Sequence, residues 1–103
     1  MKIKCRCGEK IVDNTDYLPH KAYLIRDKDW FGFWDDIDNA IENSGHSTKE
    51  KEAACMKLRL GNYARKIWQC SSCGRIYIDD EAGELHVYEP ESSKTSTTIL
   101  NKL

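Results

Sequence analysis

The sequence predicts an α+β fold in which short antiparallel strands from both ends of the chain enclose an insert of about two helices. Two observations indicate the strands: a cysteine pair near each end lies among strand-forming residues, and residues 75–89 alternate between apolar and polar side chains around a glycine. A third observation indicates the helices, because residues 33–60 carry helical periodicity and a helix-start signal.

The first quarter of the chain predicts three strands. The stretch "IKCRCGEKIV", residues 3–12, reads as a strand, a turn and a second strand, and Gly8 can adopt the positive φ that such a turn needs. Residues 13–20 combine turn-forming residues with an extended X-Pro segment. Residues 21–27 then have the composition of a third strand.

The middle of the chain predicts two helices. Residues 33–45 place apolar side chains on one face and acidic ones on the other, and Gly45 would end this helix. The expected apolar face comprises Trp34, Ile37 and Ile41. A capping box from Ser47 to Glu50 opens a second helix, which should run to about Leu60 and end at Gly61 and Asn62.

The last third of the chain predicts a strand, a hairpin and a tail. Residues 63–70 alternate as a strand, and residues 75–89 form a hairpin around Gly83. The hairpin is expected to place Ile76 and Ile78 against Leu85 and Val87. Residues 90–103 are rich in Ser and Thr and predict a mobile tail, so residues 1–89 are expected to form a single domain.

Four of the five cysteines form two closely spaced pairs, Cys5 with Cys7 and Cys70 with Cys73. The start of the chain has no apolar stretch typical of a secretory signal, so we expect a cytoplasmic protein whose thiols stay reduced. Reduced thiolates in pairs favour metal ligation over disulfides, because each tight turn can point both of its sulfurs at one ion.

The two turns, residues 5–8 and 70–74, resemble the knuckles of the zinc ribbon, a rubredoxin-like module in which each knuckle ends in Cys-Gly. This resemblance implies one structural Zn²⁺ held by Cys5, Cys7, Cys70 and Cys73. The chain departs from the family pattern in a first pair that is one residue short and in a long insert, residues 13–62. Two alternatives remain open: iron in the same site as an electron carrier, and a redox dithiol at Cys70 and Cys73.

The remaining metal-binding and catalytic candidates carry weaker patterns. Cys55 is expected to be a small buried residue of the second helix rather than a ligand. The three histidines lack metal-ligand spacing: His20, His46 and His86. No nucleophile is paired with a base, and four thiolates leave zinc no open position for water, so the chain is predicted not to be an enzyme.

The segment "DKDWFGFWDDIDNAIE", residues 27–42, surrounds Gly32 with four aromatic residues and many carboxylates. One interpretation is structural, with Trp34 and one Phe anchoring the helix to the core. The other is a surface that binds a protein with a basic face, since aromatic hot spots supply affinity and an acidic rim steers the partner. The candidate partner-binding residues are Asp27, Asp29, Trp30, Phe31, Phe33, Asp35, Asp36 and Asp38.

A basic block offers a competing nucleic-acid surface, because cationic side chains can contact phosphates and interleaved aromatic rings can stack on bases. Its candidate residues are Lys57, Arg59, Arg65, Lys66 and Arg75. The whole chain has a net charge of −1 and a pI near 6.3, which is unusual for a nucleic-acid-binding domain. The sequence also lacks the apolar run of about 18 residues that a membrane helix needs.

Taken together, these patterns predict a small non-catalytic zinc-binding protein that acts by binding another protein. In size, acidic-aromatic surface and lack of catalytic residues, the chain is similar to bacterial immunity proteins that neutralise a cognate toxin. That resemblance implies a toxin inhibitor whose partner is often a basic nuclease. The alternative is a nucleic-acid-binding zinc-ribbon regulator.

Overall fold

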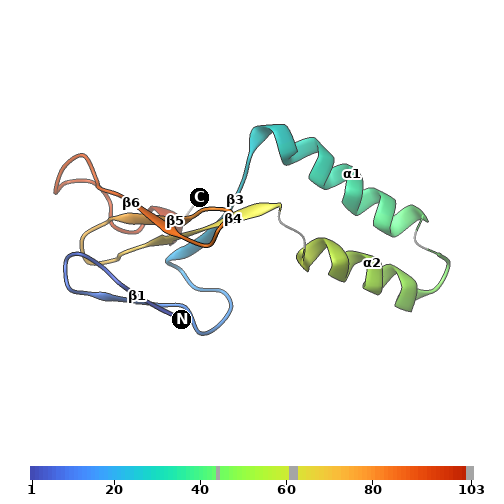
Figure 1. Ribbon diagram of the computed structural model, residues 1–103, viewed down its shortest axis with the longest axis horizontal. Coiled ribbons are helices and arrows are strands. Elements are labelled where there is room, and N and C mark those ends of the chain that lie inside the picture. The colour runs from blue at the N-terminus through green and yellow to red at the C-terminus, as the bar shows by residue number, and fades with distance from the viewer. Residues whose placement is uncertain (44, 61–62, 102–103) are drawn as a thin grey trace. The chain divides into compact units, whose positions relative to one another are not determined.

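The computed structural model describes residues 1–43, 45–60 and 63–101, and the side chains of residues 59 and 60 lie outside that description. Within these residues the α+β class is confirmed: the chain forms two α-helices and two antiparallel sheets (Figure 1). It divides into two compact units, Met1–Leu24 with Arg65–Leu103 and Ile25–Ala64. Each unit is described in turn.

The smaller sheet of the first unit contains β1 (Lys2–Lys4) and β2 (Lys10–Val12). Ile3 pairs with Ile11 across the ladder, and both side chains are buried while the lysines beside them are exposed. This alternation follows from the two-residue period of a strand. The strand–turn–strand prediction for residues 3–12 is therefore confirmed, and the turn between the strands carries the first cysteine pair.

The larger sheet has the strand order β3-β4-β5-β6, formed by β3 (Lys21–Ile25), β4 (Ala64–Gln69), β5 (Ile76–Asp79) and β6 (Leu85–Tyr88). The predicted hairpin is present, but its predicted register is wrong by one residue. Tyr77 pairs with Val87, and Ile78 pairs with His86. The turn before β6, where the Asp80 amide donates to the Glu84 carbonyl over 2.9 Å, sets this register.

The core of the first unit is small and surrounds the cysteine turns. Its buried members are Ile3, Cys5, Ile11, Trp68, Cys70 and Tyr77, and Cys73 and Val87 pack against them. The register of β5 explains why Tyr77 faces this core together with Val87, since paired residues lie on the same face of a sheet. Two of the cysteines, Cys5 and Cys70, are thus members of this hydrophobic core.

Part of the segment after β6 contacts the four-stranded sheet. The buried Gln69 side chain donates through Nε2 to the Ser96 carbonyl at 3.2 Å, and a short 3-10 helix covers Ile99–Asn101. The division into a domain over residues 1–89 and a mobile tail over residues 90–103 stays a prediction.

The second unit consists of α1 (Asp27–Asn43) and α2 (Thr48–Leu60), which pack against each other. The predicted start of the first helix at residue 33 is wrong, because α1 begins six residues earlier. Asp27 and Asp29 occupy its first turn, where the positive end of the helix dipole favours carboxylates. The Arg26 guanidinium donates to Asp29 over 2.6 Å and reinforces this start.

The packing faces of the two helices also differ from the prediction. Trp34 and Ile41 are about half exposed, whereas Ala40 is buried and Phe33 and Ile37 are half-buried. The buried face of α1 therefore centres on the small residue Ala40 rather than on Trp34 and Ile41. Among the described side chains of α2, the half-buried ones are Lys51, Ala54, Cys55 and Leu58.

The predicted start of α2 is confirmed, because the amide of Glu50 donates to the Ser47 hydroxyl over 3.1 Å, as an N-cap requires. The predicted end at Gly61 and Asn62 lies outside the described residues. Neither described helix is both long enough and apolar enough to cross a membrane.

Candidate metal centre

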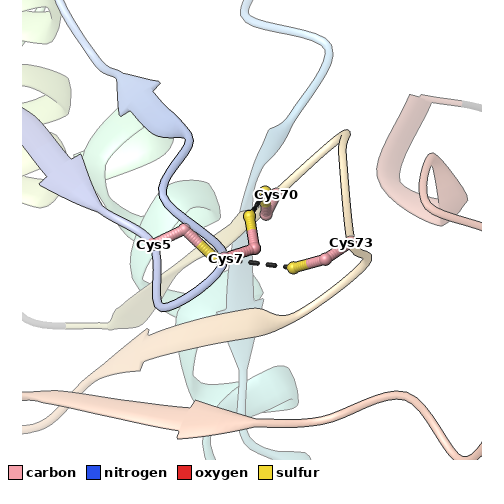
Figure 2. A group of neighbouring side chains, drawn as sticks. All are labelled: Cys5, Cys7, Cys70 and Cys73. Carbon is pink, nitrogen blue, oxygen red and sulfur yellow. Dashed lines mark hydrogen bonds between the residues drawn. The ribbon is translucent and has the colours of Figure 1, made fainter.

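The structure brings together the four cysteines that the sequence predicts as metal ligands. Cys5 and Cys7 come from the turn between β1 and β2, and Cys70 and Cys73 come from the turn after β4. All four Sγ atoms lie within 4.8 Å of one another, and Figure 2 shows their side chains converging from the two turns. The Cys5 and Cys73 sulfurs are 3.5 Å apart, and those of Cys7 and Cys70 are 3.6 Å apart.

The first turn is closed by two backbone hydrogen bonds. The Cys5 amide donates to the Glu9 carbonyl at 2.8 Å, and the Gly8 amide donates to the Cys5 carbonyl at 2.9 Å. Gly8 has a φ of 97°, a left-handed conformation that a residue with a Cβ rarely adopts. The chain reverses within this turn, which leaves both thiol groups free to point to the same side.

The second turn repeats this pattern with one more residue. The Cys70 amide donates to the Arg75 carbonyl at 2.9 Å, and the Gly74 amide donates to the Cys70 carbonyl at 2.8 Å. Gly74 has a φ of 84°, again in the left-handed region. The two turns therefore share one hydrogen-bonding plan, although their spacers differ in length.

The separations of the sulfur atoms fit one tetrahedral metal ion. A Zn–S bond of about 2.3 Å implies sulfurs about 3.8 Å apart in a regular tetrahedron. Two of the sulfur pairs, at 3.5 and 3.6 Å, and the upper limit of 4.8 Å for all pairs bracket that value. Four thiolates are a ligand set that soft metal ions prefer, so the residues present can hold a metal ion.

The cluster is buried on one side and open on the other. Cys5 and Cys70 are fully buried, Cys73 is half-buried and Cys7 is exposed. An ion bound here would be shielded by the core and reached from solvent at the Cys7 edge. The four ligands would leave such an ion no vacant position, which is typical of structural sites.

The pKa values of the two buried thiols, Cys5 and Cys70, move in opposite directions. Burial raises the pKa of Cys5, but hydrogen bonds from the Cys7 amide and the Tyr77 hydroxyl outweigh it and lower this pKa to about 6. Burial raises the pKa of Cys70 to about 12. Thiols this close cannot all ionise unless a cation offsets their mutual repulsion. A metal ion is such a cation, and the arrangement therefore suits metal binding.

Two side chains that the sequence did not mark as part of the metal centre lie beside the cysteines. Arg75 donates from Nη1 to the Cys73 Sγ at 3.3 Å, and its Nη2 lies 3.5 Å from the Glu89 carboxylate. Tyr77 packs in the same buried cluster as Cys5, and its hydroxyl accepts a hydrogen bond of 3.1 Å from the Arg6 amide. Arg75 follows a Cys-Gly pair directly and was recognisable as a neighbour of the site. Tyr77 carried no such signal, because only the strand register brings it to Cys5.

The weaker metal candidates are not members of this ligand group, as far as the described residues go. Cys55 is half-buried on α2, in the other unit. His20 Nε2 hydrogen-bonds the Val12 carbonyl at 2.6 Å, and His86 Nε2 hydrogen-bonds Asp80 at 2.8 Å. Among the described residues, the metal-ligating group consists of the two cysteine pairs alone.

The candidate partner-binding residues all lie on α1. Its rings are unequally exposed: Phe31 by 76%, Trp30 by 43% and Trp34 by 45%. Phe33 instead packs against Tyr63, with ring centroids 5.3 Å apart, and is half-buried. The four aromatic side chains therefore differ in exposure, because neighbouring residues of a helix project from different sides of it.

The carboxylates among these residues also differ in solvent exposure. Asp27, Asp35 and Asp38 are exposed, whereas Asp36 is half-buried. Asp29 is paired with Arg26. Three carboxylates therefore remain at the surface of the same helix that exposes the aromatic rings.

The candidate nucleic-acid residues are divided between the two units. Arg65, Lys66 and Arg75 belong to the first unit, Lys57 belongs to the second, and the side chain of Arg59 lies outside the described residues. Arg65 and Lys66 are neighbours on β4, so their side chains point to opposite faces of the sheet. Arg75 is engaged with Cys73 and Glu89.

Comparison with known proteins yields a single result. Residues 1–92 match a family described as a domain of unknown function, DUF8617, and this range contains both cysteine pairs and both helices. No curated protein matches the chain, and no solved structure matches it either.

Proposed function

The chain belongs to this DUF8617 family, and on that premise we propose that it is a small, non-catalytic zinc-binding protein that acts by binding another protein. The metal-binding part of the proposal is supported by four thiol sulfurs that lie within 4.8 Å of one another. They come from two turns that have the same pattern of backbone hydrogen bonds. The partner-binding part is supported by the exposed aromatic and acidic face of α1.

Zinc is the metal we propose, with a structural role. The core of the first unit is small, and Cys5 and Cys70 are two of its six buried members. Binding one ion would join the two-stranded sheet to the turn after β4 through metal–sulfur bonds. Structural zinc contributes about 10 to 16 kcal/mol of apparent folding free energy in small zinc-finger peptides at neutral pH, which is comparable with the whole stability of a typical small domain.

The proposed partner is a protein with a basic surface. Phe31 is an apolar ring held outward by a helix, which is the rigid anchor that binding hot spots require. Asp27, Asp35 and Asp38 lie on the same helix, and their field would accelerate encounter with positive charge. An inhibitor that neutralises a basic toxin, as immunity proteins do, is the form of this function that we favour.

Two measurements test this proposal. Elemental analysis of freshly purified protein should find one equivalent of zinc and little iron. Affinity capture from the native host, with the zinc-loaded parent as bait and a Phe31→Ala variant as the matched control, should yield a basic protein that only the parent retains. One equivalent of iron in place of zinc would contradict the metal-binding half of the proposal. If the parent and the Phe31→Ala variant captured the same proteins, the partner-binding half would be contradicted.

A further inference from the structure

A zinc ion held by four thiolates would leave the metal centre negatively charged, because the thiolates carry twice the charge of the ion. Two of the ligands, Cys5 and Cys70, are only 2% and 0% exposed, so much of this charge would lie in the core. A buried charge is costly unless a group of opposite charge pairs with it. The centre therefore needs a cation beside its sulfur atoms.

Arg75 supplies a cation at this place. Its Nη1 donates a hydrogen bond of 3.3 Å to the Cys73 Sγ, and its Nη2 lies 3.5 Å from a carboxylate oxygen of Glu89. The Arg75 side chain is 24% exposed, whereas that of Glu89 is 64% exposed. Because solvent weakens an ion pair with so exposed a carboxylate, the sulfur atom is the partner with which the guanidinium can interact more strongly.

The burial of the Arg75 guanidinium also favours a charged partner. Its Nε is buried and has no hydrogen-bond partner among the described residues, which is a cost to the fold. A hydrogen bond that joins two charged groups is roughly twice as strong as a neutral one. A thiolate at Cys73 would therefore offset this cost better than a thiol.

The turn after β4 fixes the backbone position of Arg75. The Cys70 amide donates to the Arg75 carbonyl at 2.9 Å, and β5 begins at the next residue. In the first turn the corresponding residue is Glu9, whose carbonyl accepts from the Cys5 amide at 2.8 Å. The residue after each Cys-Gly pair is thus an exposed glutamate in one turn and a half-buried arginine in the other. Since the shared backbone pattern does not require an arginine, its presence in the second turn needs another explanation.

We propose that Arg75 is a positioning residue of the metal centre, whose guanidinium holds Cys73 by its hydrogen bond and offsets the negative charge of the four thiolates. This inference rests on the proposed zinc site and adds to it a residue that is not a ligand. It also gives another role to a residue that the sequence offered as a contact for nucleic acid. Outer partners of metal ligands typically alter metal affinity by about 10- to 100-fold.

The test uses the full chain and two substitutions of Arg75. Arg75→Met keeps a long side chain but removes its charge and its donors, whereas Arg75→Lys keeps a positive charge. Arg65→Met is the matched control, because it makes the same change at a half-buried arginine of β4 outside the two cysteine turns. Zinc affinity is measured by competition with a chelator, and alkylation of each cysteine in the zinc-loaded protein is followed by mass spectrometry.

We expect Arg75→Met to weaken zinc binding by about 10-fold or more. It should also accelerate alkylation of Cys73 selectively over Cys70, because the lost hydrogen bond stabilised the charge on the Cys73 sulfur. Arg75→Lys should keep most of the zinc affinity, and Arg65→Met should match the parent in both measurements. If Arg75→Met does not fold, Arg75→Gln, which also lacks the charge, takes its place and should bind zinc more weakly than Arg75→Lys.

Three outcomes would overturn the inference. Parental zinc affinity in Arg75→Met would show that the guanidinium is dispensable. Equal acceleration of alkylation at all four cysteines would show that Arg75 acts on the fold as a whole, and an Arg75→Lys variant as weak as the uncharged one would show that charge is not the cause. Each of these results, seen with a zinc-binding parent, would leave the proposed function intact. A parent that binds no zinc would defeat the proposed function, and this inference with it.

Discussion

The indole Nε1 of Trp68 donates a hydrogen bond of 2.9 Å to the carboxylate of Asp13, which lies 55 residues away in the sequence. Trp68 is fully buried on β4, and Asp13 immediately follows β2. The Lys21 ammonium lies 2.8 Å from the same carboxylate, at the start of β3. One carboxylate thus links the two-stranded sheet to two strands of the larger sheet.

This linkage predicts a pH dependence of stability. The hydrogen bond and charge of Lys21, and then the Trp68 indole, hold the pKa of Asp13 below its usual value. Because the pKa is lower in the folded state, the stabilisation is fully present above the unfolded value of about 3.9 and is lost as pH falls through the folded value. Asp13→Asn should cost about 2 kcal/mol of unfolding free energy at neutral pH, and this deficit should shrink below about pH 4.

Chemical denaturation of parent and variant across a range of pH checks this prediction. Asp16→Asn makes the same change of charge at an exposed position and should leave stability nearly unchanged. A deficit for Asp13→Asn that stayed constant down to pH 2 would show that its carboxylate stabilises the fold by packing rather than by charge.

Substitution of a ligand cysteine and of the non-ligand Cys55 should have different effects on metal content. Cys70→Ser removes a buried ligand and should lose zinc together with most of the folded structure of the first unit. Cys55→Ala, on α2, should keep one equivalent of zinc and lose about 1 kcal/mol of stability for a small packing defect. Elemental analysis and circular dichroism measure both effects. Zinc loss from Cys55→Ala, or a Cys70→Ser variant as stable as the parent, would show that the ligand set is wrong.

The face of α1 predicts two separable effects on partner binding. Phe31→Ala should raise the dissociation rate and cost about 2 kcal/mol or more, as hot spots do. Phe31 is a better position for this test than Trp30, because the Trp30 ring makes an edge contact with Trp34 at 5.7 Å and is less exposed. Asp35→Lys should mainly slow association and reduce its dependence on salt.

Surface plasmon resonance against the captured partner measures both rates. Met56→Ala removes an exposed apolar side chain from α2 and is the matched control, expected to bind like the parent. Each variant is first shown to stay folded, since the same helix packs against α2. Parental kinetics in folded Phe31→Ala and Asp35→Lys would place the partner surface elsewhere.

The basic residues predict weak nucleic-acid binding. Arg75 is engaged with Cys73 and Glu89, and Arg65 and Lys66 point to opposite faces of β4. We therefore expect no dissociation constant below about 1 µM for generic DNA or RNA at physiological salt, the range of unspecific phosphate contacts. A gel shift that is tight, salt-sensitive and selective for sequence would instead support the nucleic-acid regulator.

Features that depend on local chemistry could be predicted from the sequence alone. The Cys-Gly turns were recognisable because glycine at a positive φ and closely spaced thiols form a pattern that needs no distant partner. The start of α2 was recognisable for the same reason, since the hydroxyl of Ser47 caps an amide only three residues away. The α+β class then followed from the order of these local elements.

Contacts between residues that are distant in the sequence could not be predicted, because they depend on packing. The start of α1, the face of α1 that is buried and the register of the β5–β6 hairpin depend on packing partners, and all three differ from the predictions. The position of Tyr77 shows the physical reason most clearly. Its hydroxyl lies at the first cysteine turn because strand pairing carries it there across 71 residues, and no local preference in the sequence encodes that distance.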